Sequence, residues 1–343
     1  MVVVSETSDI VVMSLDEIFA LAYRVLSGAG LSRAHAEAVA HTIMVSERDA
    51  CASHGLHRLP GCVMTIRSGK LSLDAEPKVE DVTPSLVRVD AGYGYSRLAF
   101  DRGTPSLVEK ARRCGIAAMA INDCFHFSAL WPEVEALTDL GLAALAMTPS
   151  HAWVAPAGGT RGLLGTNPIA FGWPRSGRHP YVFDFATSAM ARSELARRKS
   201  EGTPIVEGIG LGPDGTPTTD ASAALDGAML TFGGHKGSAL STMIELMAGP
   251  LIGDRTSLAS MEFDEDLKLA PCHGELVMAF DPAVMAGGRV DQGTAWAEAL
   301  FSGFAEQGAR LPSERRYAAR ARTIAEGVSV PRPLHERLLA LES

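Results

Sequence analysis

Residues 116–148 read IAAMAINDCFHFSALWPEVEALTDLGLAALAMT, and their pattern is the strongest indication of a fold in the chain. Two apolar runs, 116–122 and 142–148, are predicted to be strands, and residues 130–140 between them are predicted to be a helix. A further helical segment, residues 99–114, precedes the first strand. Helices that alternate with apolar strands are typical of an α/β fold with a mixed sheet covered on both faces.

The two ends of the chain have a different pattern, in which apolar residues recur at helical spacing. The segments with this pattern are 14–27, 32–50, 296–307, 313–327 and 333–341. The first of them begins with Ser14 and Glu17, which fit a capping box. We therefore expect a helical unit built from residues 1–115 and 290–343, and a central α/β unit of residues 116–289.

Composition excludes several classes of protein. The 343 residues contain no apolar run long enough to span a membrane, and the net charge of −9 comes without a dense basic tract for nucleic acid. The N-terminus lacks the basic and apolar regions of a secretory signal. Five scattered cysteines without a C-x-x-C pair indicate a reducing compartment, so we expect a cytoplasmic protein.

The usual nucleotide-binding motifs are missing. Residues 208–213, GIGLGP, have proline where the third glycine of a dinucleotide fingerprint belongs, and we interpret them as a loop. Residues 233–238, GGHKGS, lack the spacing of a phosphate-binding P-loop. They lead into an apolar helix, however, so His235 and Lys236 could belong to an anion site at its start. A tight turn capped by Ser238 is the alternative.

Residues 53–58, Ser-His-Gly-Leu-His-Arg, place His54 four residues before Arg58. On a turn or short helix the two side chains share a face. An arginine can hold a carboxylate with two hydrogen bonds, and a histidine can give a proton to the neighbouring carbon's oxygen or nitrogen. The alternative is that the histidine and the arginine are surface residues at the start of a helix without a functional role. No carboxylate or thiol lies at metal-ligand spacing from His54 and His57, so no metal is expected.

Three other positions follow predicted strands or lie in glycine-rich loops, where ligands often bind. They are His126, the pair Thr166-Asn167, and Asp184. Each also has a structural interpretation: a half-buried histidine, an ordinary turn, and a cap of the next helix. Arg192 and Glu194 follow, and a solvated charge pair is the simplest interpretation of those two.

Taken together and in order, these motifs resemble the type-2 malate/L-lactate dehydrogenase family over residues 14–330. The motifs are SHGxxRLPG at 53–61, HF at 126–127, GTNPIA at 165–170, DxATS at 184–188, GGHKG at 233–237 and RLPxxRR at 310–316. Within the family, residues 126–135 and 230–241 resemble the Δ1-piperideine-2-carboxylate/Δ1-pyrroline-2-carboxylate reductases. The resemblance implies a homodimer and a nicotinamide cofactor in a fold that is not Rossmann, with NADPH preferred and NADH as the alternative.

The resemblance also implies roles for individual residues. His54 would be the proton donor, with Ser53 and Glu194 as its relay, and Arg58, Thr166 and Arg192 would bind substrate. The imine reductases have aspartate at position 194, preceded by His-Gly, whereas this chain has Arg192-Ser193-Glu194. The cofactor would be lined by His126, Phe127, Ser128, Ala129, Leu130, Asp184, Phe185, Ala186, His235, Lys236, Arg310, Leu311, Pro312, Arg315 and Arg316.

The expected activity is therefore that of an NAD(P)H-dependent oxidoreductase that reduces cyclic 2-imino acids. It would convert Δ1-piperideine-2-carboxylate to L-pipecolate and Δ1-pyrroline-2-carboxylate to L-proline. The nearest alternative is a malate/L-lactate-type 2-hydroxy-acid dehydrogenase, because the same site can serve C=O or C=N. A binding protein that has lost catalysis is the alternative from another class.

Overall fold

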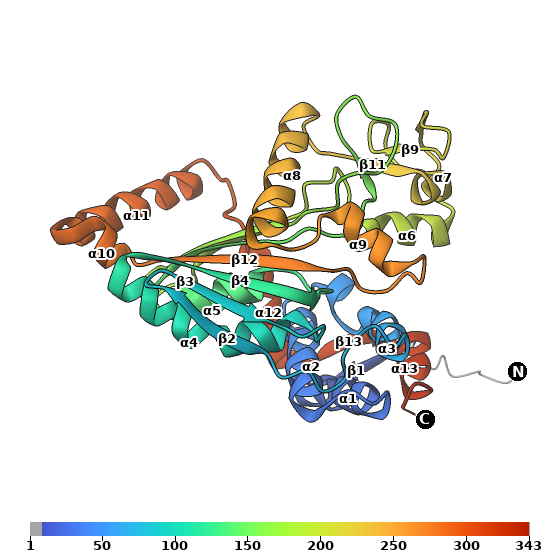
Figure 1. Cartoon of the computed structure of the whole chain (residues 1–343), viewed down its shortest axis with the longest axis horizontal. Helices are drawn as coiled ribbons and strands as arrows, with labels where there is room; N and C mark the ends of the chain where they lie inside the picture. Colours follow the sequence, from blue (N-terminus) through green and yellow to red (C-terminus); the bar gives the residue numbers. More distant parts are fainter. Residues whose placement is uncertain (1–8, 343) are drawn as a thin grey trace, which may run out of the picture. The chain divides into compact units, whose positions relative to one another are not determined.

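The computed structural model describes residues 9–342 (Figure 1). Its internal contacts divide the chain into two compact units, residues 1–74 with 314–343 (unit 1) and residues 75–313 (unit 2). Among the residues described, no helix is both long and apolar enough to cross a membrane.

Unit 1 is mainly helical and joins the two ends of the chain. Its helices are α1 (Leu15–Gly28), α2 (Arg33–Arg48), η1 (Ala52–His54), η2 (Leu56–Arg58), α3 (Leu59–Arg67), α12 (Glu314–Glu326) and α13 (Arg332–Leu339). The capping box at the start of α1 is confirmed, because Ser14 and Glu17 exchange side-chain and backbone hydrogen bonds. Strand β1 (Ile10–Met13) pairs antiparallel with β13 (Val328–Pro331), an element that the sequence pattern did not indicate.

Unit 2 is built on a seven-stranded sheet. In spatial order its strands are β2 (Lys78–Thr83), β3 (Leu86–Asp90), β4 (Ile116–Phe125), β12 (Cys272–Phe280), β5 (Ala143–Met147), β7 (Ile169–Trp173) and β8 (Tyr181–Phe185). Only β3 and β4 run parallel, and the other neighbours are antiparallel. The mixed α/β sheet expected from the sequence is confirmed, and β4 and β5 are the two strands expected within residues 116–148.

Helices cover both faces of this sheet (Figure 1). On one face lie α4 (Ser96–Cys114) and α5 (Trp131–Asp139), and on the other lie α8 (His235–Ala248) and α9 (Ser257–Asp264). Ile244 and Ala248 of α8 pack on a buried patch of the sheet made by Met147, Ile169 and Leu276. This packing places the start of α8 away from the sheet and exposed to solvent.

A smaller sheet completes unit 2, with strand order β10 (Pro217–Thr218), β9 (Gly210–Leu211), β11 (Ala228–Leu230) and β6 (Val154–Ala155). Helices α6 (Arg192–Glu201) and α7 (Ala221–Asp226) pack against it through a small apolar core. The remaining elements are η3 (Pro250–Ile252), α10 (Pro282–Ala286), η4 (Gly287–Arg289) and α11 (Val290–Glu306). The GIGLGP stretch is a turn with the two-residue strand β9, and no helix follows it directly, in agreement with the loop interpretation.

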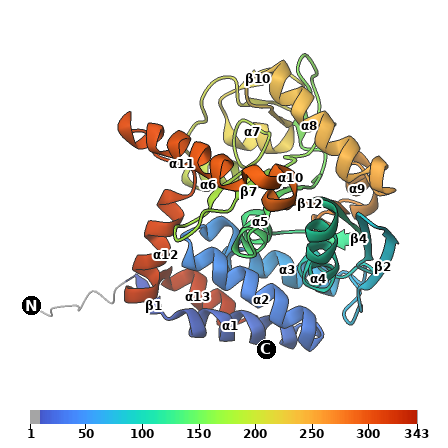
Figure 2. The same cartoon turned by 90° about the vertical axis from the view of Figure 1, so that its left-hand side faces the viewer.

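The unit boundaries differ from those expected at residues 115/116 and 289/290. Strands β2 and β3 extend the large sheet beside β4, so residues 75–115 pack with the strands rather than with the helical unit. Helix α11 also belongs to unit 2, because the Phe301 ring stacks on Tyr181 of β8 at 5.3 Å and Glu298 pairs with Arg175 at 2.6 Å. The helical pattern of the C-terminal segments did not reveal which helix packs with which unit. Figure 2 shows α10 and α11 from a second direction.

Candidate functional site

The His54 segment of unit 1 consists of two successive 3-10 turns, η1 and η2. The Ser53 hydroxyl lies 3.1 Å from Nδ1 of His54, and the Arg58 Nε donates to the Ser53 carbonyl over 2.8 Å. The backbone N–H of His54 donates to the Cys51 carbonyl, which closes the first turn. The structure therefore brings Ser53, His54 and Arg58 together, as the sequence motif suggested.

Glu47 of α2 holds this segment in place, and the sequence analysis did not single it out. Its buried carboxylate accepts a 2.7 Å hydrogen bond from the backbone N–H of Leu56. Burial raises the Glu47 pKa, although the bond from Leu56 opposes the shift. A Cβ on Gly55 would lie 2.2 Å from Oε1 of Glu47, so only glycine fits between them. The sequence signal that could have indicated Glu47 is an acidic residue at a position of α2 that the helical pattern buries.

We expect Gly55→Ala to lower kcat by about 10–100-fold, because a small displacement of a catalytic side chain has an effect of that order. The added methyl group would push the Glu47 carboxylate away from Leu56 and shift the turn that carries His54. The measurement is steady-state kinetics beside Gly61→Ala. Position 61 lies on the adjoining helix α3 with no atom within 4 Å of a built Cβ. Equal kcat values for the two variants would contradict this role of Gly55.

The predicted cofactor segment 310–316 crosses the boundary between the units at residues 313/314. In unit 1, Nη1 of Arg316 lies 3.3 Å from Oδ2 of Asp49, whose side chain is fully buried. Arg320 and Arg48 also pair with Asp49, at 2.7 and 2.8 Å. Arg316 is therefore engaged in a structural ion pair, whereas Arg315 is exposed. Arg310 lies in unit 2 and is exposed too, while Leu311 is buried and Pro312 partly buried.

In unit 2, the GGHKG stretch forms a turn that leads into α8. Gly233 and Gly234 both have φ of 59°, and the Thr231 hydroxyl donates to the Gly234 carbonyl. A Cβ on Gly237 would lie 1.9 Å from the Phe232 carbonyl oxygen, so the turn requires glycine there. The Ser238 hydroxyl accepts from the Ala157 N–H and does not cap α8. The interpretation of Ser238 as a cap is wrong, and the uncapped helix start with exposed His235 and Lys236 suits an anionic group.

The structure brings residues 126–130 and 184–186 together. Residues 126–130 connect β4 to α5, and Oδ2 of Asp184 accepts hydrogen bonds from the Leu130 and Trp131 N–H groups, at 2.8 and 2.9 Å. Asp184 was expected either to meet a ligand or to cap the helix that follows it. It caps the start of α5, an earlier helix, rather than the helix that follows it, and so fixes the shape of the 126–130 segment, while its contact with a ligand stays a prediction.

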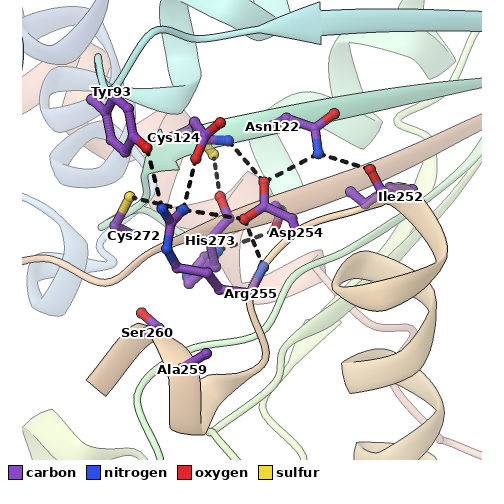
Figure 3. Close-up of polar contacts among 12 residues, drawn as sticks. Tyr93, Asn122, Cys124, Ile252, Asp254, Arg255, Ala259, Ser260, Cys272 and His273 are labelled. Atoms are coloured by element: carbon purple, nitrogen blue, oxygen red, sulfur yellow. Dashed lines mark hydrogen bonds and ion pairs between the residues drawn. The ribbon is translucent and has the colours of Figure 1, made fainter. Parts of the chain in front are cut away.

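The end of β4 that precedes His126 is fastened by an ion-pair network that the sequence did not indicate (Figure 3). Nη1 of Arg255 lies 2.7 Å from Oδ1 of Asp123, and its Nη2 lies 3.2 Å from the Tyr93 hydroxyl. Asp254 accepts hydrogen bonds from the Asp123 N–H and the Asn122 side chain. These contacts join the η3–α9 connection to β4, which gives the 126–130 segment a rigid support.

Thr166 and Asn167, expected together as ligand contacts, separate into two roles. Asn167 is fully buried, and its amide donates to the Ser241 carbonyl and to Oε1 of Glu245. Glu245 also accepts hydrogen bonds from the N–H groups of Gly165 and Ser257. Its carboxylate therefore holds this loop in place through three hydrogen bonds. Asn167 is therefore structural. The half-buried Thr166 hydroxyl makes no hydrogen bond within residues 9–342 and is available to a ligand.

Arg192 and Glu194, two residues apart at the start of α6, have different surroundings. The Arg192 guanidinium stacks 4.2 Å from the Trp153 ring, its Nη2 donates to the Leu225 carbonyl, and burial lowers its pKa to about 10. Glu194 accepts from Arg197 and Arg198, and these bonds, Arg197 first, lower its pKa to about 2. The pair is not a mutual ion pair, because each side chain is occupied by other groups. Trp153 is a contact that the sequence analysis missed.

Comparison with known proteins assigns the class. Residues 13–339 match the family model described as malate/L-lactate dehydrogenase, so the chain belongs to that family. It is an oxidoreductase of a family whose members use NAD(P).

Particular relatives are named for one reaction. The chain is 59% identical to a Δ1-pyrroline-2-carboxylate/Δ1-piperideine-2-carboxylate reductase of Pseudomonas aeruginosa, over 96% of this chain and 98% of the relative. It is 50% identical to a Δ1-pyrroline-2-carboxylate reductase of Agrobacterium fabrum, over 94% of each. The crystal structure of a Δ1-piperideine-2-carboxylate reductase from Pseudomonas syringae matches with a TM-score of 0.92 at 39% identity, covering 96% of this chain and 99% of that one.

Proposed function

We propose that this protein is an NADPH-dependent reductase of cyclic 2-imino acids. It converts Δ1-pyrroline-2-carboxylate to L-proline and Δ1-piperideine-2-carboxylate to L-pipecolate. The observation that carries the proposal is the 50–59% identity to relatives named for these substrates, over nearly their whole lengths. The arrangement of Ser53, His54 and Arg58 supports it, because the three residues can bind a carboxylate beside a proton donor.

His54 is the proposed proton donor. The Ser53 hydroxyl lies at Nδ1 and orients the imidazole, and Nε2 is the nitrogen that we propose gives the proton to the substrate nitrogen. Arg58 uses its Nε on the Ser53 carbonyl, which leaves its terminal nitrogens for two hydrogen bonds to the substrate carboxylate. When bound, a reduced nicotinamide would supply the hydride that C2 receives. The protein's own contribution is to orient the imino acid and to deliver one proton from His54.

The other predicted contacts remain part of the proposal. Thr166 offers its hydroxyl to the substrate. Arg192 is supported as a substrate contact by its buried Nη1, which has no hydrogen-bond partner within the described residues. Glu194 is the proposed relay carboxylate, and it would have to exchange its bonds with Arg197 and Arg198 for that task.

The residues of unit 2 fit an anionic dinucleotide. The start of α8 has no side-chain cap and exposes His235 and Lys236, which suits a phosphate group, and the first turn of the helix has no room for a side chain at Gly237. We infer that residues 126–130 and 184–186 line the cofactor, together with Arg310, Leu311, Pro312, Arg315 and Arg316. NADPH is the proposed cofactor, with NADH as the alternative.

A cytoplasmic homodimer is part of the same proposal. All five cysteines are free, as expected in a reducing compartment. Helix α11 exposes Trp296 and Leu300, whose relative exposures are 66% and 63%, beside the buried Phe301. Exposed apolar side chains grouped on one helix are typical of a surface that another chain covers.

The decisive assay compares NADPH oxidation by the purified protein with four substrates: the two cyclic imines, pyruvate and oxaloacetate. We expect turnover with the imines at a kcat/KM far above that with the keto acids. Turnover restricted to the keto acids would support a 2-hydroxy-acid dehydrogenase instead, the activity that the name of the family suggests. Because C=N and C=O differ in their polar contacts around C2, one site is expected to favour one of them.

A further inference from the structure

Three side chains with metal-binding chemistry meet inside unit 2. His126 follows β4, Glu133 lies in the first turn of α5, and Glu275 lies on β12. Nε2 of His126 is 3.8 Å from Oε2 of Glu275, and one nitrogen or oxygen of each residue lies within 4.8 Å of the other two. Their relative exposures are 5%, 1% and 0%, so the cluster is closed to solvent.

The two carboxylates of this cluster lack the donors that buried carboxylates need. Within residues 9–342, both carboxylate oxygens of Glu275 lack a hydrogen-bond partner. The same is true of Oε2 of Glu133. By contrast, Glu245, another buried carboxylate of the same unit, accepts three bonds, from Gly165, Asn167 and Ser257. A buried polar atom without a partner is rare in native proteins and indicates a catalytic role or a bound water or ion.

The surroundings of the cluster favour a cation. Asp184 lies at the same end of α5, where it caps the helix above Glu133. Arg97 of α4, which interacts electrostatically with Glu133 and Glu275, forms a 2.9 Å ion pair with Asp101, so its charge is already shared. His273, whose ring lies 6.1 Å from that of His126, has Nδ1 within 3.0 Å of the Thr148 hydroxyl. None of these neighbours donates to Glu275, whereas a dication would balance the two carboxylates.

We propose that His126, Glu133 and Glu275 bind one divalent transition-metal ion through an imidazole nitrogen and two carboxylate oxygens. An ion about 2.1 Å from each of two ligand atoms can join atoms up to about 4.2 Å apart, which accommodates the 3.8 Å separation of His126 and Glu275. One nitrogen and two oxygens suit Zn²⁺, Co²⁺, Mn²⁺ or Fe²⁺, while Mg²⁺ and Ca²⁺ prefer oxygen ligands alone.

The ion would have a positioning role. It would fasten the first residue of the 126–130 segment to α5 through Glu133 and to the central strand β12 through Glu275. The His126 imidazole is the only group of this segment that the ion would use, so the ion would take none of the backbone groups of residues 126–130. The site does not depend on the proposed reaction, and metal binding is measured without any substrate.

The test uses the full chain after dialysis against a chelator. Zn²⁺ binding is measured by calorimetry, and Co²⁺ binding by its visible absorption. We expect one equivalent of either ion in the wild-type protein and at least a tenfold loss of affinity in both Glu275→Gln and Glu133→Gln. Each substitution keeps the size of the side chain and removes its charge, and circular dichroism and the melting temperature check that both variants fold.

The matched control is Asp264→Asn. It alters another buried histidine–carboxylate pair of unit 2, in which Oδ1 of Asp264 lies 3.7 Å from Nε2 of His151. We expect this variant to bind the ion as the wild type does. No saturable binding to the wild type, or equal affinities in the wild type and both glutamine variants, would overturn the proposal. A failed reductase assay would leave the binding result unaffected.

Discussion

Replacing His54 by alanine should lower kcat by about 10²–10⁴-fold, which is the usual contribution of a positioned general acid. His54 contacts the Ser53 hydroxyl through Nδ1, and the Arg58 guanidinium donates to the carbonyl of the same Ser53. Without the imidazole, the developing negative charge on the substrate nitrogen must take its proton from water. The measurement is steady-state kinetics with Δ1-pyrroline-2-carboxylate and NADPH, over a range of pH.

Cofactor binding separates this effect from a loss of structure. His54 is not among the proposed cofactor contacts, and the proposed phosphate contacts lie at the start of α8. NADPH titrated against His54→Ala should therefore give a fluorescence-derived Kd within about threefold of the wild-type value. His57→Ala is the matched control, because His57 lies in η2, the 3-10 turn that follows that of His54, and is exposed. A His54→Ala enzyme with wild-type kcat would contradict the proton-donor role.

Asp49→Ala should destabilise unit 1 by about 3–5 kcal/mol, the usual cost of leaving a buried ion-pair network without one charge. The Asp49 side chain is fully buried, and it pairs with Arg48 at the end of α2 and with Arg316 and Arg320 of α12. Its removal leaves three guanidinium groups without their common partner. Chemical denaturation followed by circular dichroism measures the change in the free energy of unfolding.

The pH dependence of this difference follows from the direction of the Asp49 pKa shift. Burial alone would raise this pKa, but hydrogen bonds from Arg320 and Arg48 outweigh burial and lower it below 3.8. Its contribution to stability is therefore fully present above the ordinary value and is lost as the pH falls through the folded-state pKa. The gap between wild type and variant should narrow below pH 3.8. Glu37→Ala, in an exposed pair with Arg33, should change stability little, and an equal effect of both substitutions would contradict the account.

Local patterns in the sequence predicted the parts of the fold that depend on short-range order. The apolar runs at 116–122 and 142–148 became β4 and β5, and Ser14 with Glu17 formed the expected capping box. The boundaries between the units could not be predicted in the same way. The sequence of β3 is compatible with pairing to β4 or to another strand. Which strand it pairs with depends on contacts between residues far apart in the chain.

The same distinction applies to the candidate site. Ser53, His54 and Arg58 are close in sequence, so their motif predicted their proximity. Asp184 caps a helix that begins more than fifty positions earlier, and no local pattern indicates that contact. Ser238, which the alternative interpretation made a cap, bonds to Ala157 because another loop passes near the start of α8. His126, Glu133 and Glu275 do not have the sequence spacing of a known metal-binding motif. They meet only because the fold pairs β12 with β4.

The most direct test of the proposed reaction is a competition with labelled cofactor. The purified protein is incubated with equimolar Δ1-pyrroline-2-carboxylate and pyruvate and with NADPH that carries deuterium at the transferred position of C4. The products are separated by chiral chromatography, and their deuterium content is measured by mass spectrometry. The account predicts L-proline with one deuterium at C2 and almost no labelled lactate. Deuterated lactate as the main product, with unlabelled or undetectable proline, would contradict it.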